Sequence, residues 1–396
     1  MIWTSFALIF LGLWQCAAPA TFGYEDPTHF FTGLLLIIGG FYLRRQSSFP
    51  VRWALAFVGL FLQLSPLLFW AKSPAQYLND TLIGVLVILF AIIFPSHEKA
   101  ETPSLPPGWS YNPSTWPSRI LIAFFATIGW FISRYLAAYQ LGYIHTMWDP
   151  FFGNGTINVI TSAVSRAFPV SDAGLGAASY TIELLLACYG GRMRWCHSPW
   201  LVIIYGILVV PVSIVSIVLI ILQPLAVGSW CTLCILTAIC MLVMATLAVG
   251  ELVLVVQMLI KSRGTGFWKG FNVQQTSADK RTLAVHSPLK DLLLFALTGI
   301  TPTWRLLVSA VLGVILITSQ SLKDLDPIFG ALVIVTSVLS MVEPIRSWRF
   351  ANAAWGCLIL GALFWTGSVL LMHGAIAILL IWLSLKAGTK REECRC

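Results

Sequence analysis

The chain has 396 residues, of which 58% are hydrophobic and 10% are charged. Soluble domains carry about 25% charged residues, so the composition excludes a soluble globular protein and predicts one embedded in a membrane. The net charge of +8 does not indicate a nucleic-acid partner, because apolar segments separate the basic residues. The sequence contains no nucleotide-binding loop, zinc-protease helix or long soluble domain.

Apolar runs predict membrane helices along the whole chain. The first run, residues 2–19, ends in CAAPA and fits either a signal peptide cleaved after Ala20 or a retained helix; the missing basic n-region favours retention. Further helices are predicted at 30–43, 52–70, 79–95, 118–138, 172–190, 199–222, 231–258, 304–320, 327–343, 350–369 and 371–386. The predicted fold class is an all-α polytopic membrane protein with about twelve transmembrane helices.

The basic residues predict the orientation of these helices. With the N-terminus inside the cell, all of the 24 Lys and Arg residues fall at the inner side except Lys72, Arg134, Arg166 and Lys323. Cytoplasmic loops are enriched in Lys and Arg, which supports this orientation. It places the C-terminus in the cytoplasm and residues 224–240 at the outer face, where disulfides persist.

Two polar stretches, 96–117 and 261–303, are interpreted as cytoplasmic linkers between three domains. The domains are an N-terminal helix group (1–95), a central four-helix unit (118–260) and a C-terminal helix group (304–396).

The two outer groups resemble each other. The sequence from Gly33 is echoed from Gly330: both runs have a Gly-started apolar helix, a basic turn, and a second helix opened by a tryptophan, which indicates an internal duplication. These groups also resemble the SPW-repeat type of bacterial membrane domain, with Ser65, Pro66 and Trp53 as a partial match. That resemblance implies no activity.

One short run, PLAVGSWCTLCILTAIC, carries the chemistry. Cys231 and Cys234 lie three residues apart at the start of an apolar helix, so their sulfurs can share one face and close a disulfide. The positive end of a helix dipole stabilises a thiolate, and Trp230 is a residue type that anchors at a membrane boundary. The run predicts electron transfer between an outer thiol and an apolar acceptor. Spacing alone also allows inert buried cysteines, as expected for Cys240 and Cys357, or half of a soft-metal site.

The central unit, residues 118–260, resembles the vitamin K epoxide reductase family. The resemblance rests on WCTLC (Trp230 to Cys234), a long outer loop (141–170), a short helix with Ser and Thr in that loop (Thr156 to Arg166), and FPVSDAGLGAASY (Phe168 to Tyr180) opening the next helix. It implies a four-helix bundle that holds a quinone, ubiquinone or menaquinone, near its outer end.

The resemblance also implies roles for individual residues. Cys234 would face the quinone, and Cys231 would exchange disulfides outward with a thioredoxin-like thiol protein. Ser162 falls where the family keeps a serine that lines the site. Asp172 falls where a family enzyme has an asparagine that hydrogen-bonds a quinone carbonyl, and an aspartate donates such a bond only when protonated.

This sequence also departs from the family. Its outer loop lacks the two relay cysteines, and Thr156 stands at the second of these positions. Ala238 replaces a tyrosine that usually follows the Cys-x-x-Cys pair by one turn. We therefore expect a partner to attack Cys231 directly, or Cys16 to substitute if the first helix is retained.

Two carboxyl groups and an aromatic cluster complete the set of candidates. Glu183 is expected to serve a proton path or an interhelical hydrogen bond, and Glu251 to be structural near the inner interface. The loop side chains of His145, Trp148, Phe151 and Phe152 fit an interfacial belt better than a lid over an apolar pocket. Arg134, near the outer end of its helix, is expected to snorkel or to pair with Asp149 or Asp172.

The sequence thus predicts a multi-pass protein, of a bacterial inner membrane if the resemblance holds, with Cys231 and Cys234 at the periplasmic face. Its first functional hypothesis is a membrane thiol:quinone oxidoreductase. The alternative is a non-catalytic membrane scaffold or quinone-binding module of the same descent, and a soft-metal site at the cysteine pair is a third.

Overall fold

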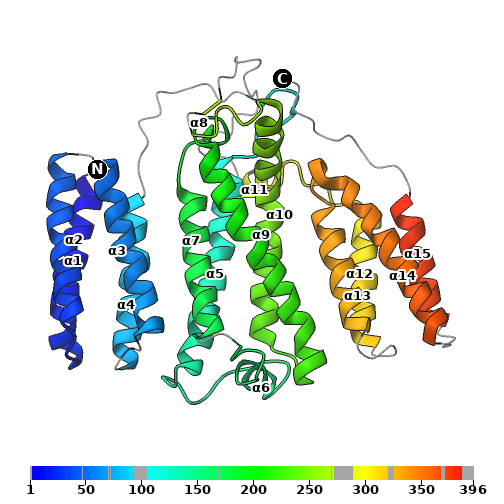
Figure 1. Cartoon of the computed structure of the whole chain (residues 1–396), viewed down its shortest axis with the longest axis horizontal. Coiled ribbons are helices and arrows are strands. Elements are labelled where there is room, and N and C mark those ends of the chain that lie inside the picture. The colour runs from blue at the N-terminus through cyan, green and yellow to red at the C-terminus, as the bar shows by residue number, and fades with distance from the viewer. Residues whose placement is uncertain are drawn as a thin grey trace. The chain divides into compact units, whose positions relative to one another are not determined.

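The computed structural model of the chain describes residues 2–46, 48–69, 71, 73–92, 105–167, 170–268, 270–271, 289–319, 325–366 and 371–385. In these ranges the regular elements are helices, apart from one isolated β-bridge between Ile300 and Val342 (Figure 1). Six helices are long and apolar enough to cross a membrane, so the chain is a multi-pass membrane protein. The larger number of spans stays a prediction, because the other described helices are shorter or less apolar.

The helices follow the predicted apolar runs, with ends shifted by a few residues. The N-terminal group contains α1 (Ile2–Phe22), α2 (Pro27–Arg45), α3 (Phe49–Leu68) and α4 (Pro74–Ile92). The central group contains α5 (Trp116–Gln140), α6 (Gly155–Ile160), α7 (Asp172–Cys188), α8 (Arg194–His197), α9 (Pro199–Leu222) and α10 (Thr232–Lys261). The remaining helices are α11 (Leu289–Ala296), α12 (Trp304–Ser319), α13 (Leu325–Leu339), α14 (Phe350–Thr366) and α15 (Leu371–Leu385).

The structure adds α11, which the sequence pattern does not predict because it has only eight residues and lies in the second polar linker. Much of the two linkers, including 96–104 and 272–288, falls outside the described residues.

The chain divides into two compact units. Unit 1 comprises Met1–Glu98, Ala126–Tyr189 and Cys231–Leu233, and unit 2 comprises Lys99–Phe125, Gly190–Trp230 and Cys234–Cys396.

Glycines let the helices of unit 1 approach closely in pairs. A methyl group added to Gly12 of α1 would lie 2.7 Å from the carbonyl oxygen of Gly33 in α2, and one added to Gly33 would lie 2.7 Å from the oxygen of Gly12. Gly59 of α3 and Gly84 of α4 approach each other in the same reciprocal way, also at 2.7 Å. Small residues at such contacts drive helix association in lipid through close packing.

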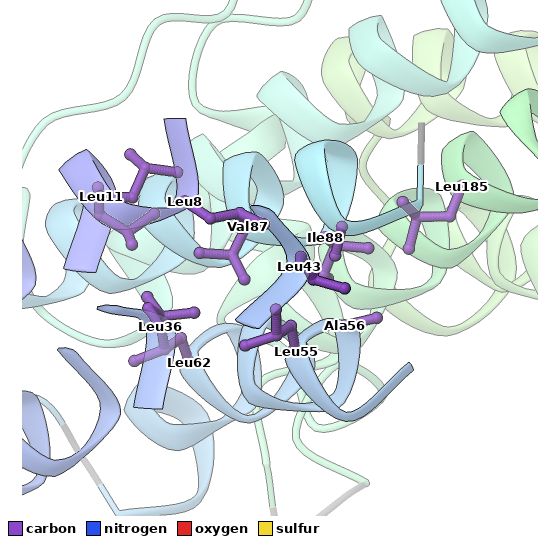
Figure 2. Packing of buried hydrophobic residues seen from close by; sticks show 12 residues of the cluster. Leu8, Leu11, Leu36, Leu43, Leu55, Ala56, Leu62, Val87, Ile88 and Leu185 are labelled. Atoms are coloured by element: carbon purple, nitrogen blue, oxygen red, sulfur yellow. The ribbon is translucent and has the colours of Figure 1, made fainter. Parts of the chain in front are cut away.

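A buried aliphatic cluster joins these helix pairs (Figure 2). It takes Leu8 from α1, Leu36 from α2, Leu55 from α3 and Ile88 from α4, and Leu185 of α7 extends it to the central group. The cluster therefore ties the N-terminal group to a helix of the central group.

Hydrogen bonds strengthen the same connection within unit 1. The hydroxyl of Tyr77 in α4 donates to the carbonyl of Arg134 in α5 at 3.0 Å, and Arg134 donates to the carbonyl of Leu78 at 2.5 Å. The hydroxyl of Thr181 in α7 donates to the side-chain oxygen of Gln63 in α3 at 3.2 Å. These bonds satisfy polar groups that lipid would leave unsatisfied.

Unit 2 repeats the glycine packing. A methyl group on Gly313 of α12 would lie 2.8 Å from the carbonyl oxygen of Gly330 in α13, and one on Gly330 would lie 2.6 Å from that of Gly313. In α14, a methyl group on Gly356 would lie 2.8 Å from the carbonyl oxygen of Ala377 in α15.

Each flanking group also holds a buried His–Asp pair. In unit 1 the Nε2 atom of His29 lies 2.7 Å from Oδ1 of Asp80, and both side chains are almost fully buried. In unit 2 Nε2 of His373 lies 2.9 Å from Oδ1 of Asp326, with equal burial. Gln15 adds a hydrogen bond of 3.3 Å to Asp80.

The glycine contacts show that the two pairs occupy equivalent positions in exchanged order. His29 precedes Gly33 of α2 by four residues, and Asp326 precedes Gly330 of α13 by four residues. Likewise, Asp80 precedes Gly84 of α4 by four residues, and His373 precedes Ala377 of α15 by four residues. The two flanks therefore share one packing scheme and preserve the pair while reversing which helix carries the histidine.

We expect His29→Leu to lower the free energy of unfolding by about 3–5 kcal/mol, because it leaves a buried carboxyl group without its imidazole partner. Exchanging the residues, His29→Asp with Asp80→His, reproduces the arrangement of the C-terminal flank and is expected to recover most of this loss. Thermal melting of the full chain in lipid nanodiscs measures both effects. An exchanged protein as unstable as the single variant contradicts the equivalence of the two flanks.

Candidate active site at the start of α10

The cysteine pair lies where the sequence predicts, at the start of the last helix of the central domain. Cys231 and Cys234 are joined in a disulfide, and α10 begins between them at Thr232. Cys231 is fully buried, whereas Cys234 is half-buried. The pair is therefore in its oxidised form, and the sulfur of Cys231 is shielded from solvent.

The backbone before the pair explains its position. Helix α9 ends in a π-helical turn, Gln223–Val227, that contains Pro224. Gly228 follows with φ 68°, a left-handed conformation that favours glycine and stops the helix. The chain reverses direction there and enters α10 four residues later, at Thr232.

Asp149 of the outer loop binds the segment that follows Cys231. Its Oδ1 accepts a hydrogen bond from the hydroxyl of Thr232 at 2.5 Å. Its Oδ2 accepts from the hydroxyl of Thr156 at 2.6 Å and from the backbone N–H of the same residue at 3.0 Å. The N–H groups of Phe151 and Phe152 also donate to Oδ1, at 3.1 and 3.0 Å. One carboxylate thus organises the loop and joins it to the cysteine motif.

Burial works to raise the pKa of Asp149, but these hydrogen bonds outweigh it. The hydroxyls of Thr156 and Thr232 and the N–H groups of Phe152 and Phe151 hold the pKa of the carboxyl well below its ordinary value of 3.8. Asp149 is therefore ionised at neutral pH.

Ser162 lies just beyond α6 and not within it. The sequence predicts a short helix from Thr156 to Arg166, but α6 ends at Ile160. The hydroxyls of Thr161 and Ser162 donate to the carbonyls of Ile157 and Val159, at 2.8 and 2.7 Å, and such side-chain bonds compete with helix continuation.

Asp172 begins α7, with Ser171 as its N-cap, as the predicted helix opening requires. Its Oδ1 accepts from Nε2 of Gln140 at 2.6 Å, and its Oδ2 accepts from the hydroxyl of Ser165 at 2.8 Å. Asp172 therefore holds Gln140 and Ser165 in place. Its role toward a quinone stays a prediction.

A cavity of about 420 Å³ opens beside this hydrogen-bonded group, within unit 1. Its walls combine apolar and polar side chains: Leu67, Leu141, Ile144 and Ile160 with Tyr139, Gln140, His145, Thr161, Ser165, Arg166 and Ser171, together with Gly142 and Val170. This volume lies in the range of about 300–1,000 Å³ that is typical of small-molecule sites. The mixture suits a flat headgroup that has carbonyl oxygens on an apolar ring.

The rings of Trp148, Phe151 and Phe152 are exposed, whereas His145 of the same loop lines the cavity. Phe151 is 79% exposed and Trp148 is 67% exposed. This exposure agrees with the interfacial-belt interpretation, in which such rings lie at the headgroup level of the bilayer.

The two carboxyl groups of the central helices have opposite surroundings. Glu251 accepts from Nε and Nη2 of Arg194, at 2.7 and 2.6 Å, and from the hydroxyl of Ser114 at 2.7 Å. It is structural, as predicted, but it is buried and paired and does not lie at an exposed interface. Glu183 is fully buried, and neither of its oxygens has a hydrogen-bond partner among the described residues.

Two other groups were named from the sequence. Arg134 was expected to snorkel or to pair with Asp149 or Asp172, and it donates to the backbone carbonyl of Leu78 in α4. Cys16 is a free cysteine, and its sulfur faces Gly33 of α2, where an added methyl group would lie 2.4 Å from it. The relay role of Cys16 stays a prediction.

A match to the family described as "Vitamin K epoxide reductase family" covers residues 120–249. The central domain matches this family. The match includes the outer loop, Asp149, Asp172 and both cysteines, so the disulfide lies in the part of the chain that carries the family pattern. No curated protein and no solved structure matches the chain significantly.

The depressed pKa of Asp149 predicts how stability depends on pH. A carboxyl with a folded-state pKa below its unfolded value stabilises the protein above about pH 4, and this contribution is lost as the pH falls through the folded-state pKa. The difference in melting temperature between wild type and Asp149→Asn should be constant above about pH 5 and shrink below about pH 4. A difference that widens in acid contradicts this expectation.

The two buried glutamates predict opposite responses to one substitution. We expect Glu251→Gln to destabilise the protein by about 3–5 kcal/mol, since it leaves the Arg194 guanidinium buried without a countercharge. Glu183→Gln serves as the matched control and should melt close to wild type, because no ion pair is lost. Equal losses in both variants would show that the ion pair is not the source of the effect.

Proposed function

We propose that the chain is a membrane thiol:quinone oxidoreductase of the vitamin K epoxide reductase type. The observation that carries this proposal is the disulfide between Cys231 and Cys234 at the start of α10, inside the segment that matches the family. A disulfide at a helix N-terminus favours the thiolate of its reduced form, which is the reactive species in exchange.

The proposed chemistry consists of two exchanges. In the first, an outer dithiol gives two electrons and two protons to the Cys231–Cys234 disulfide, so the outer pair becomes a disulfide and the two cysteines become thiols. A bound quinone supplies an acceptor for two electrons and two protons. In the second exchange the reduced pair releases these to the acceptor through Cys234, and its own disulfide forms again.

The cavity between α3, the end of α5 and the outer loop is the proposed headgroup site. His145 and Arg166 line it and have hydrogen-bond donors that suit carbonyl oxygens, while Leu67 and Ile160 supply apolar contact. In this proposal Asp172 acts through Gln140 and Ser165, which it holds in place, and Ser162 shapes the turn that carries Ser165. Ubiquinone and menaquinone both present the required carbonyls.

The proposed location is a bacterial inner membrane, with the cysteine pair at the periplasmic face and the C-terminus in the cytoplasm. The distribution of Lys and Arg along the sequence supports this orientation. A periplasmic thioredoxin-like protein is the proposed electron donor, because that compartment maintains disulfides.

A second candidate function is a non-catalytic scaffold or quinone-binding module. Two observations favour it: the loop carries Thr156 in place of a relay cysteine, and Cys231 is fully buried. The intact disulfide favours the oxidoreductase.

The deciding experiment measures the thiol state of the purified protein. We expect alkylation and mass analysis to find Cys231 and Cys234 disulfide-bonded, reducible by dithiothreitol, and reoxidised within minutes of adding a short-chain ubiquinone analogue. Cys234→Ser should abolish reoxidation, whereas the matched control Cys240→Ser should preserve it, because Cys240 is a free, buried cysteine. Reduced thiols that persist in the presence of quinone would favour the scaffold.

A further inference from the structure

The outer sulfur of the proposed active site is covered in the structure. Cys231 is 0% exposed, although the proposed function requires an outer thiol to reach the disulfide. Thiol–disulfide exchange needs a thiolate to approach a sulfur directly, so a covered sulfur reacts slowly. Access to this disulfide therefore depends on movement of the residues around it.

One hydrogen bond joins the loop to the cysteine motif within unit 1. Asp149 Oδ1 accepts from the hydroxyl of Thr232, the residue that directly follows Cys231. The other hydrogen bonds of Asp149, from Thr156 and from the N–H groups of Phe151 and Phe152, lie inside the loop and keep its carboxylate aimed at Thr232. Breaking the bond to Thr232 removes this link between the loop and α10 and leaves the other hydrogen bonds of Asp149 intact.

The charge of Asp149 adds a second effect. An attacking thiolate is an anion, and an ionised carboxylate beside its path repels it. A partner that carries a cationic group next to its thiol would pair with the carboxylate as the bond to Thr232 breaks, so the carboxylate keeps a partner throughout.

We propose that Asp149 is a latch that closes the outer loop over the Cys231–Cys234 disulfide and selects for thiols that have a neighbouring positive charge. The proposal rests on the proposed function, because it describes how the electron donor reaches the same disulfide. Asp149 acts as a positioning residue: it controls access to the sulfur and takes no part in the exchange itself.

Three thiols with the same two-carbon chain and different charge test the latch on the full chain in nanodiscs, without quinone. Cysteamine is a cation, 2-mercaptoethanol is neutral and 2-mercaptoethanesulfonate is an anion. The rate of reduction of the disulfide, read by maleimide labelling and mass analysis and corrected for the thiolate fraction of each reagent, is the measured quantity. Wild type should react fastest with the cation and slowest with the anion.

The variants separate the hydrogen bond from the charge. Thr232→Val removes the bond and should accelerate reduction by all three thiols about ten-fold, since a hydrogen bond to a charged group is stronger than one between neutral groups. Thr232→Ser keeps the hydroxyl and should react as wild type does. Asp149→Asn should react faster and lose the preference for the cation. Thr146→Val, an exposed position of the same loop, is the matched control and should not differ from wild type.

Three results would overturn the proposal: wild-type rates in both Thr232→Val and Asp149→Asn, equal acceleration in Thr232→Ser and Thr232→Val, or an unchanged charge preference in Asp149→Asn. Adding a ubiquinone analogue after reduction tests the proposed function separately. A protein that shows the latch but is not reoxidised by quinone refutes the oxidoreductase and leaves the latch standing. Reoxidation without any effect of the variants refutes the latch alone.

Discussion

A strongly polar side chain inside a membrane bundle is costly unless a second polar group satisfies it, and much of this structure follows from that constraint. His29 meets Asp80, His373 meets Asp326, and Arg194 meets Glu251, each pair joining helices that are distant in sequence. Glycine contacts pack other pairs of helices in the two flanks together, α1 with α2, α3 with α4, α12 with α13 and α14 with α15. Glu183 departs from this rule, because neither of its carboxyl oxygens has a hydrogen-bond partner among the described residues.

The same constraint explains how much of the fold could be predicted. Backbone groups in lipid must be satisfied within a helix, so each apolar run long enough to span the bilayer predicts a helix almost by itself. The start of α7 was predictable because Ser171 and Asp172 form a local capping signal. The end of α6 was predicted too late in the chain. The hydroxyls of Thr161 and Ser162 bond to backbone carbonyls of α6 and so compete with the hydrogen bonds that would continue the helix, which composition does not reveal.

The candidate site likewise has a local part that the sequence reveals and a long-range contact that it does not reveal. The Cys-x-x-Cys pair is local, so its place at the start of a helix follows from spacing alone. The bond between Asp149 and Thr232 joins residues 83 positions apart, and no local pattern marks it. Asp149 appeared in the sequence only as a possible partner for Arg134. A signal was nevertheless present, because Thr156 replaces a cysteine in the loop, and its hydroxyl completes the hydrogen bonding of the carboxylate.

The exchanged order of the two His–Asp pairs has a consequence for membrane insertion. A chain with two copies of one helix set risks pairing a helix of the first copy with a helix of the second as they emerge into the bilayer. Joining α2 to α15 in this way would place His29 against His373, and joining α13 to α4 would place Asp326 against Asp80. Either mismatch leaves like groups facing each other in a medium that cannot solvate them, whereas each correct partnership matches an acid with a base. Because the histidine lies in α2 in the first copy and in α15 in the second, each of these helices finds a complementary partner at the equivalent position only within its own copy. The two similar bundles can then assemble without exchanging helices.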